Sequence, residues 1–143
     1  MRPIGHHVIV DVWEADPAVL NHAPTLGAAL ETACKEAGAT LMGTWKKTFT
    51  PQGVTVLVCL SESHASIHTY PELGYYAADM FTCGALNPTE AVIGLVRRLG
   101  GRANGLIVPR GEGLEVKFEP IRFTFEPAPG TSSELSSKAD CSS

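Results

Sequence analysis

The order in which strand-like and helix-like segments follow one another constrains the fold of this chain more than any other feature. Alternating or β-branched apolar residues, typical of β-strands, occur in residues 6–13, 39–50, 53–60, 65–70, 75–83, 103–110 and 114–125. Helical spacing of apolar residues occurs in 17–38 and again in 87–101. This order predicts an α+β fold: a two-layer sandwich in which an antiparallel sheet carries two helices packed on one face.

The helical segment at 87–101 has the clearest boundaries. Asn87 can cap its start, Pro88 suits its first turn, and Gly100 suits its end. In the earlier helical segment, Gly38 is the expected C-terminal cap. These signals predict one helix before the second strand and another before the last two strands.

The length of 143 residues predicts a single domain, which we place at residues 1–125, and the net charge of the chain is −4. Residues 126–143 are rich in Pro and Ser and are expected to form a disordered tail. The charge offers no basic patch for nucleic acid or an anionic membrane. No apolar run reaches the roughly 20 residues that cross a bilayer, and the N-terminus lacks a signal-peptide pattern. We therefore expect a cytoplasmic protein with no nucleic-acid or membrane partner.

The four cysteines form no C-x-x-C pair, so the sequence indicates neither a zinc ribbon nor a redox motif. Without a secretory signal, free thiols are expected rather than disulfides. Cys34 is expected on a buried helix face, Cys59 on a strand buried on both faces, and Cys141 in the tail. Only Cys83 has polar neighbours.

Residues 61–84, SESHASIHTYPELGYYAADMFTCG, combine serines, histidines, acids and a thiol in a mostly apolar part of the chain. In an extended segment His64, Ser66, His68 and Tyr70 would share one face. Two histidines on one face could bind a metal with Cys83 as a third ligand, or a Ser–His pair could support acyl transfer. The spacing is diagnostic of neither, because no G-x-S-x-G motif surrounds the serines. Hydrogen-bonded polar residues at a strand end are the simpler interpretation.

The same stretch closely resembles the signature of the short, prokaryotic-type S-adenosylmethionine decarboxylases, roughly S-E-S-H-x-x-I-H-T-W-P-E-x-G-Y-x-x-x-D-x-F-T-C-G. The resemblance extends more loosely from the N-terminal GHHVIVDVWEAD to the helix that ends near Arg98, and it fades beyond Gly101. The residues that match the signature are Ser61, Glu62, Ser63, His64, Ile67, His68, Thr69, Pro71, Glu72, Gly74, Tyr75, Asp79, Phe81, Thr82, Cys83 and Gly84.

Membership of this family implies that the chain cuts itself between Glu62 and Ser63 into a β chain (1–62) and an α chain (63–143). The Ser63 hydroxyl would attack the Glu62 carbonyl to give an ester, and loss of the Ser63 α-proton would leave dehydroalanine. Hydrolysis would then release ammonia and leave a pyruvoyl group, the cofactor of the family. The resemblance gives His68 the role of base for the α-proton, and Thr55, where relatives usually have serine, a supporting role in processing.

The resemblance also implies how the mature enzyme works. The pyruvoyl carbonyl made from Ser63 would form a Schiff base with the substrate amine, and Cys83 would return a proton to the substrate after loss of CO₂. A thiol is mostly protonated at neutral pH and can act as an acid. Phe49 and Tyr70 would offer aromatic faces to S-adenosylmethionine, and Glu72 would bind its ribose. No metal is implied.

The implied activity is decarboxylation of S-adenosylmethionine for spermidine and other polyamine synthesis, by a homodimer of processed protomers in which two copies complete each site. Lys46 and Lys47 depart from this pattern, because a positive charge at the site would repel a sulfonium. A pyruvoyl-dependent arginine or ornithine decarboxylase of the same family therefore stays open. So does a non-catalytic homologue that binds a nucleoside-like ligand.

Overall fold

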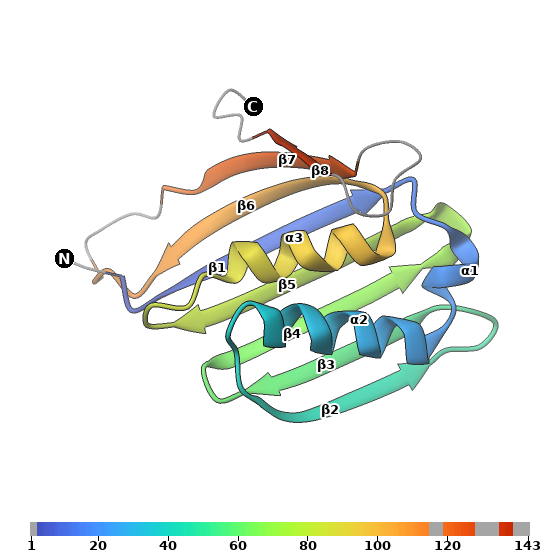
Figure 1. Ribbon diagram of the computed structural model, residues 1–143, viewed down its shortest axis with the longest axis horizontal. Helices are drawn as coiled ribbons and strands as arrows, with labels where there is room; N and C mark the ends of the chain where they lie inside the picture. Colours follow the sequence, from blue (N-terminus) through green and yellow to red (C-terminus); the bar gives the residue numbers. More distant parts are fainter. Residues whose placement is uncertain (1–2, 115–118, 128–134, 139–143) are drawn as a thin grey trace.

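A computed structural model describes residues 3–114, 119–127 and 135–138 of the chain. The described strands form one antiparallel sheet, in the spatial order β2-β3-β4-β5-β1-β6-β7-β8 (Figure 1). Their bounds are Gly5–Trp13 (β1), Leu41–Thr48 (β2), Val54–Leu60 (β3), Ser63–Tyr70 (β4), Tyr75–Cys83 (β5), Arg102–Arg110 (β6), Ile121–Pro127 (β7) and Leu135–Lys138 (β8). The helices are α1 (Pro17–Leu20), α2 (Ala23–Glu36) and α3 (Pro88–Leu99), with a 3₁₀ turn, η1 (Pro71–Leu73), between β4 and β5.

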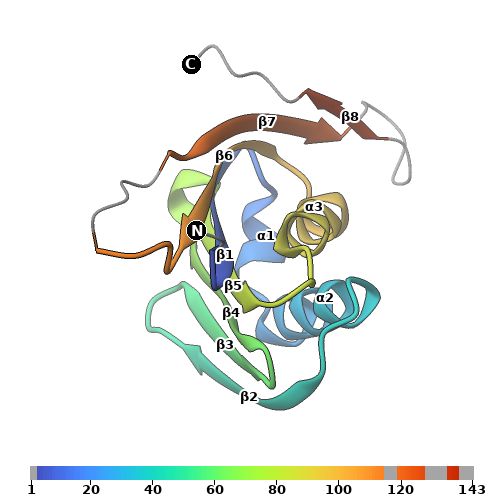
Figure 2. The same cartoon turned by 90° about the vertical axis from the view of Figure 1, so that its left-hand side faces the viewer.

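The helices α2 and α3 lie side by side over one face of the sheet (Figures 1 and 2). The opposite face, here called the open face, carries no helix in the described part of the chain (Figure 2). Because successive side chains of a strand point to opposite faces, each strand divides into a core-facing set and an open-face set. In β1, for example, Val8, Val10 and Val12 are buried, whereas the alternate Ile9 and Asp11 are exposed.

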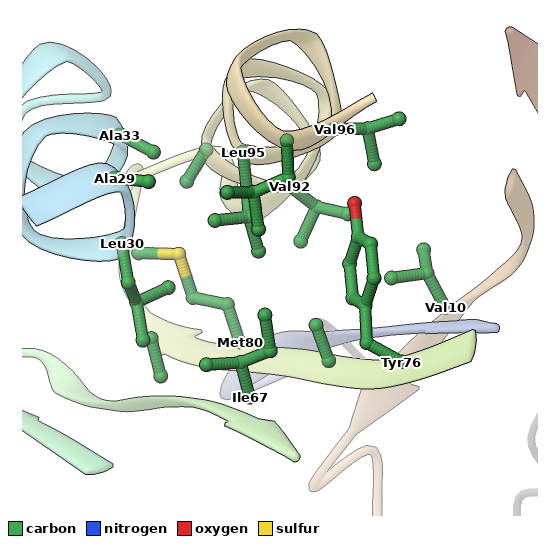
Figure 3. Close-up of a cluster of buried hydrophobic side chains, with 14 of the residues drawn as sticks. Val10, Ala29, Leu30, Ala33, Ile67, Tyr76, Met80, Val92, Leu95 and Val96 are labelled. Atoms are coloured by element: carbon green, nitrogen blue, oxygen red, sulfur yellow. The ribbon is translucent and has the colours of Figure 1, made fainter. Parts of the chain in front are cut away.

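The core lies between the helices and the sheet. Figure 3 shows Leu30 of α2 and Leu95 of α3 above Ile67 of β4 and Met80 of β5. Tyr76 extends from β5 toward α3 beside Val92 and Val96, and its hydroxyl donates to the carbonyl oxygen of Gly100 (3.3 Å). Burial raises the pKa of Tyr76 well above its usual value, so this hydroxyl stays a donor.

The predicted α+β fold, with an antiparallel sheet and helices packed on one face, is confirmed. The first helical segment differs from the prediction because it is divided into α1 and α2. Proline cannot sit inside a helix, since it has no N–H and its ring clashes with the preceding turn. Pro24 instead lies in the first turn of α2, where the ring of His22 caps the helix by accepting from the amide of Thr25 (3.3 Å).

Strand β3 is buried on one face only, which corrects the prediction that both of its faces are buried. Val54, Val56 and Val58 face the helices, but Leu57 is 42% exposed and Cys59 is also exposed. The physical reason is that no described helix covers the open face. Cys34, by contrast, is buried as predicted, and burial together with the nearby Glu31 raises its pKa to about 11.

The C-terminal region differs from the predicted disordered tail in two places. Glu126 and Pro127 continue β7 beyond the predicted domain end at residue 125, and Leu135–Lys138 pairs with β7 as β8. Cys141, which was predicted to lie in the tail, and the rest of the tail lie outside the described residues. Strand pairing uses backbone groups, so a segment poor in apolar side chains can still extend a free sheet edge.

None of the helices in the described ranges is long and apolar enough to cross a membrane.

The buried Leu95 provides a test of the core. Replacing it, 1% exposed, with alanine should lower the free energy of unfolding by about 2–5 kcal/mol, because a cavity remains between α3 and the sheet. The measurement is denaturant unfolding in a Ser63→Ala chain, which keeps the protein in one piece, at fixed protein concentration. The matched control, Leu114→Ala at a fully exposed site, should change it by less than about 0.5 kcal/mol. Equal effects of the two changes would contradict the described core.

Candidate active site

The turn between β3 and β4 holds Glu62, the residue before the predicted cleavage point, by several hydrogen bonds. Its carboxylate accepts from the amide of Thr40 (3.0 Å) and from the hydroxyl of Ser61 (3.0 Å). The amide of Ser61 in turn donates to the carbonyl of Thr40 (3.0 Å). The Thr40 amide is the main cause that holds the pKa of the Glu62 carboxyl below its usual value. Glu62 is therefore a fixed anion at neutral pH.

The backbone at the predicted cleavage point meets the end of β5. The amide of Cys83 donates to the carbonyl oxygen of Glu62 (3.2 Å). Ser63 itself opens β4 with a φ of 149°, in the range that residues other than glycine rarely adopt. The fold thus brings together Glu62, Ser63 and Cys83, which the sequence assigned to cleavage and to proton donation.

A cluster of polar side chains lies beside Ser63 on the open face, and Asp79 of β5 is its centre. The hydroxyl of Ser66 donates to Asp79 Oδ1. Nε2 of His7, from β1, lies 2.7 Å from Asp79 Oδ2, and Nε2 of His64 lies 3.1 Å from the same oxygen. A guanidinium nitrogen of Arg110 lies 3.1 Å from Nδ1 of His7. The cluster draws its residues from four strands, β1, β4, β5 and β6.

The hydrogen bonds of this cluster keep Asp79 ionised. Partial burial raises the pKa of the carboxyl, but the hydrogen bonds from Ser66, His7 and His64 outweigh burial, and the net pKa lies below the usual value. The side chain is 23% exposed, compared with 17% for His7 and 47% for His64. Asp79 is therefore a half-buried anion with its oxygens already occupied.

The structure does not bring together His64, His68 and Cys83, the three ligands of the metal site considered from sequence. His64 lies with His7 and Asp79 instead, and ligand atoms of these three residues are within 4.8 Å of one another. These ligand atoms are already hydrogen-bonded to one another, so their closeness is no independent sign of a metal.

A second group of predicted site residues lies toward the other end of the open face. Thr55 faces His68 across β3 and β4, with its hydroxyl 3.1 Å from His68 Nδ1. Tyr70 ends β4, Glu72 lies exposed in η1, and Phe49 follows β2 with its amide bonded to the Gly53 carbonyl (2.8 Å). Tyr70 and Phe49 are 45% and 48% exposed, so neither is an ordinary core residue.

Aromatic rings continue this second group across the sheet. The ring of Tyr70 lies 5.5 Å from that of Tyr75, and Tyr75 lies 4.5 Å from Trp13, centroid to centroid. The Tyr75 hydroxyl donates to Asp11 (2.6 Å), and burial, with Asp11 beside it, raises the Tyr75 pKa to about 12. The group presents aromatic faces and a carboxylate at one end of the open face, a combination suited to a base and a ribose.

The two groups are well separated within one chain. Ser63 and His68 are five residues apart on the same strand, and at about 3.3 Å per residue their Cα atoms lie about 16 Å apart. The predicted base for the α-proton therefore does not reach Ser63 of its own chain. The structure brings Thr55 together with His68, and Glu62 with Ser63 and Cys83, but it does not join these two sets.

Sequence reasoning gave no role to His7, Asp79 or Arg110. Asp79 and His64 were visible as matches to the signature, but His7 and Arg110 lie outside it. The pairing of β1 with both β5 and β6 brings these residues to the site, since His7 lies opposite Phe81 and Val108. Of the two lysines that depart from the signature, Lys47 lies opposite Thr55, and Lys46 occupies the space beside Gly27 of α2.

Comparison with known proteins gives consistent matches. The family model described as S-adenosylmethionine decarboxylase matches residues 6–107. An S-adenosylmethionine decarboxylase proenzyme of Prochlorococcus marinus (strain MIT 9313) is 46% identical over 101 residues, which cover 71% of this chain and 81% of the relative. A proenzyme of the same name from Methanococcus aeolicus is 44% identical over 93 residues, covering 64% and 80%. A crystal structure of the adenosylmethionine decarboxylase from Aquifex aeolicus VF5 aligns with a TM-score of 0.73 at 30% identity, covering 82% of this chain and 98% of that one.

The lowered pKa of Asp79 predicts a loss of stability in acid. Because the folded-state pKa lies below the unfolded one, Asp79 stabilises the fold above its unfolded pKa, and this contribution disappears as pH falls through the folded pKa. In a Ser63→Ala background, the free energy of unfolding should therefore fall less between about pH 7 and pH 3 after Asp79→Asn. The exposed control Glu119→Gln should leave the pH dependence unchanged. If the free energy of unfolding falls as much in acid after Asp79→Asn as before it, the lowered pKa of Asp79 is refuted.

Proposed function

This chain belongs to the S-adenosylmethionine decarboxylase family, and from that premise we propose that it decarboxylates S-adenosylmethionine with a pyruvoyl group made from its own Ser63. The observation that carries the proposal is the contact of the Cys83 amide with the Glu62 carbonyl, directly beside the Ser63 hydroxyl. The product, decarboxylated S-adenosylmethionine, is the aminopropyl donor for spermidine synthesis.

The geometry of the Glu62–Ser63 peptide suits an attack by the serine hydroxyl. As Ser63 Oγ bonds to the Glu62 carbonyl carbon, negative charge develops on the carbonyl oxygen. The Cys83 amide already donates to that oxygen at 3.2 Å, and a pre-positioned donor of this kind stabilises a tetrahedral oxyanion. The positive φ of Ser63 adds about 1–3 kcal/mol of backbone strain, which is released when the peptide is cut.

The position of Ser63 also fits the group that it would become. Ser63 begins β4 and is half-buried. Cys83, which is exposed and carries the thiol, lies at the end of the neighbouring strand β5. A pyruvoyl group at this position would supply the carbonyl that accepts electrons from the substrate when CO₂ is lost. Cys83 holds the proton that is returned to the substrate. Glu72, Tyr70 and Phe49 bind its nucleoside part and, because they lie at the other end of the open face of their own chain, come from the second copy of a dimer.

We propose further that the active enzyme is a homodimer whose copies pair through their open faces. In a two-fold dimer, a residue at one end of the interface meets residues from the other end of the partner. Such pairing would bring His68 of one copy to Ser63 of the other, across the separation that one chain cannot close. Apolar side chains available for this contact lie on the open face of several strands: Ile9, Trp13, Trp45 and Leu57 are 42–58% exposed.

The cleavage itself gives the first test of the function. Intact mass should show fragments 1–62 and 63–143, the second with a pyruvoyl N-terminus instead of serine. Ser63→Ala should stay in one piece without activity, because it lacks the attacking oxygen. Cys83→Ala should still be cleaved but should release CO₂ from S-adenosylmethionine at least about 100-fold more slowly. A wild-type chain that stays uncut would refute the proposal, and CO₂ release from arginine alone would refute the substrate.

Co-expression of two inactive variants tests the division of each site between two copies. A tagged His68→Ala chain retains Ser63, and an untagged Ser63→Ala chain retains His68. In the mixed dimer one site combines the intact Ser63 of the first with the intact His68 of the second, so the tagged chain should be cleaved. Each variant expressed alone should stay uncut. If the tagged chain remains whole in verified mixed dimers, His68 does not act across the interface.

A further inference from the structure

We propose that His64 is the base that takes the hydroxyl proton of Ser63 in the first step of chain cleavage, and that Asp79, supported by His7 and Arg110, positions it. The inference rests on the proposed function, because it concerns the reaction that makes the pyruvoyl group. It assigns to His64 a step that is separate from the α-proton transfer of His68.

The distances describe a chain of hydrogen-bonding atoms that begins at the reacting hydroxyl. Ser63 Oγ lies 3.3 Å from Nδ1 of His64, and Nε2 of the same ring lies 3.1 Å from Asp79 Oδ2. A hydroxyl, an imidazole and a carboxylate in this order form the arrangement by which a serine is activated as a nucleophile. All three residues come from β4 and β5, whose register pairs His64 with Phe81 and Ser66 with Asp79.

The partners of the cluster determine which ring nitrogen carries a proton. The ionised carboxylate of Asp79 only accepts hydrogen bonds, so both histidines present Nε2–H to its Oδ2. The Arg110 guanidinium only donates, and its position at Nδ1 of His7 fixes that ring in the same tautomer. With Nε2–H directed at Asp79, neutral His64 has its lone pair on Nδ1, the atom that faces Ser63.

The proton balance of the step follows from this tautomer. The Ser63 Oγ–H proton moves to His64 Nδ1 as Oγ bonds to the Glu62 carbonyl carbon, and the resulting imidazolium is stabilised by the Asp79 carboxylate. As the bond from that carbon to the Ser63 nitrogen breaks, the same proton passes to the nitrogen. The products are an ester and a free amine, with His64 again neutral and no oxidant, reductant or metal consumed.

A cation held by His7, His64 and Asp79 is the competing interpretation of the cluster, and the contacts disfavour it. Metal binding would need Nε2 lone pairs where the rings present Nε2–H to Asp79. The Arg110 guanidinium, which also lies 5.5 Å from the centre of the Phe81 ring, would add repulsion beside a divalent ion.

Hydroxylamine at neutral pH separates the step assigned to His64 from the step assigned to His68, because it cleaves an ester but leaves an ordinary peptide bond intact. A His68→Ala chain, which is blocked after the ester forms, should be cut by hydroxylamine between Glu62 and Ser63 and leave an N-terminal serine. The double variant His64→Ala/His68→Ala should be cut at least about 100-fold more slowly, since a general base contributes about that much or more. Mass spectrometry reads the fragments, so no activity assay is needed.

Further variants distinguish a chemical role of His64 from a structural one. His64→Ala alone should cleave itself at least about 100-fold more slowly than the wild type, and added imidazole should restore part of the rate. Asp79→Asn should also slow cleavage, but less than His64→Ala, because it removes the carboxylate that orients the ring and stabilises the imidazolium and leaves the imidazole that takes the proton. The control His22→Asn removes an imidazole at the exposed start of α2 while keeping a helix cap, and it should cleave normally. If circular dichroism shows that the His64→Ala chain is unfolded, His64→Gln provides the same comparison with a bulkier side chain.

The results that would overturn the role of His64 differ from those that would overturn the proposed function. A folded His64 variant that cleaves within about threefold of the wild type, or a double variant as sensitive to hydroxylamine as His68→Ala, would overturn the role of His64 and leave the pyruvoyl function intact. Cleavage of the wild type that stops when metal is removed by chelation would favour the cation instead. A wild-type chain that never cleaves would overturn the proposed function itself.

Discussion

The covering of only one face of the sheet by α2 and α3 is the constraint on which the rest of this structure depends. Alternation along each strand sends Val8, Ile67 and Met80 into the core and sends their neighbours His7, Ser66 and Asp79 to the open face. Burial of the first set stabilises the fold, and the second set is thereby free to carry chemistry. A shift of one residue in the pairing of β4 with β5 would exchange the two sets.

Much of the fold could be predicted from local patterns, because strand alternation and helix caps such as Asn87 are encoded within a few residues. The Ser63 and Cys83 assignments came from a contiguous signature. His7 and Asp79 are 72 residues apart, and no local pattern reveals that β1 lies between β5 and β6. The same lack of global information explains the error at β3, since an apolar run does not tell whether a second layer covers it. The pairing of β8 depends on an available edge of β7 rather than on side-chain pattern.

The hydrogen bonds around Asp79 bear on how an open face can be both reactive and suitable for contact with a partner. An unpaired carboxylate would lose its hydration if a second copy covered it, at a cost of several kcal/mol. Asp79 already receives hydrogen bonds from Ser66, His7 and His64, so covering it would remove little further stabilisation. The apolar side chains nearby, Ile9 and Leu57, would at the same time lose contact with water favourably. Polar chemistry and pairing are thus compatible on one surface.

The separation of the two histidines along β4 has a consequence for the order of events. The hydrogen-bonded series from Ser63 through His64 to Asp79 is complete within one chain, so ester formation as proposed would require no second copy. If His68 removes the α-proton, as proposed, that step requires a partner, because the Cα of His68 lies about 16 Å from that of Ser63 in its own chain. The ester and the amide interconvert without loss of atoms, whereas elimination makes the cut permanent. In this scheme the reactive ketone forms irreversibly only after two copies have met, which prevents an unpaired chain from carrying an exposed electrophile.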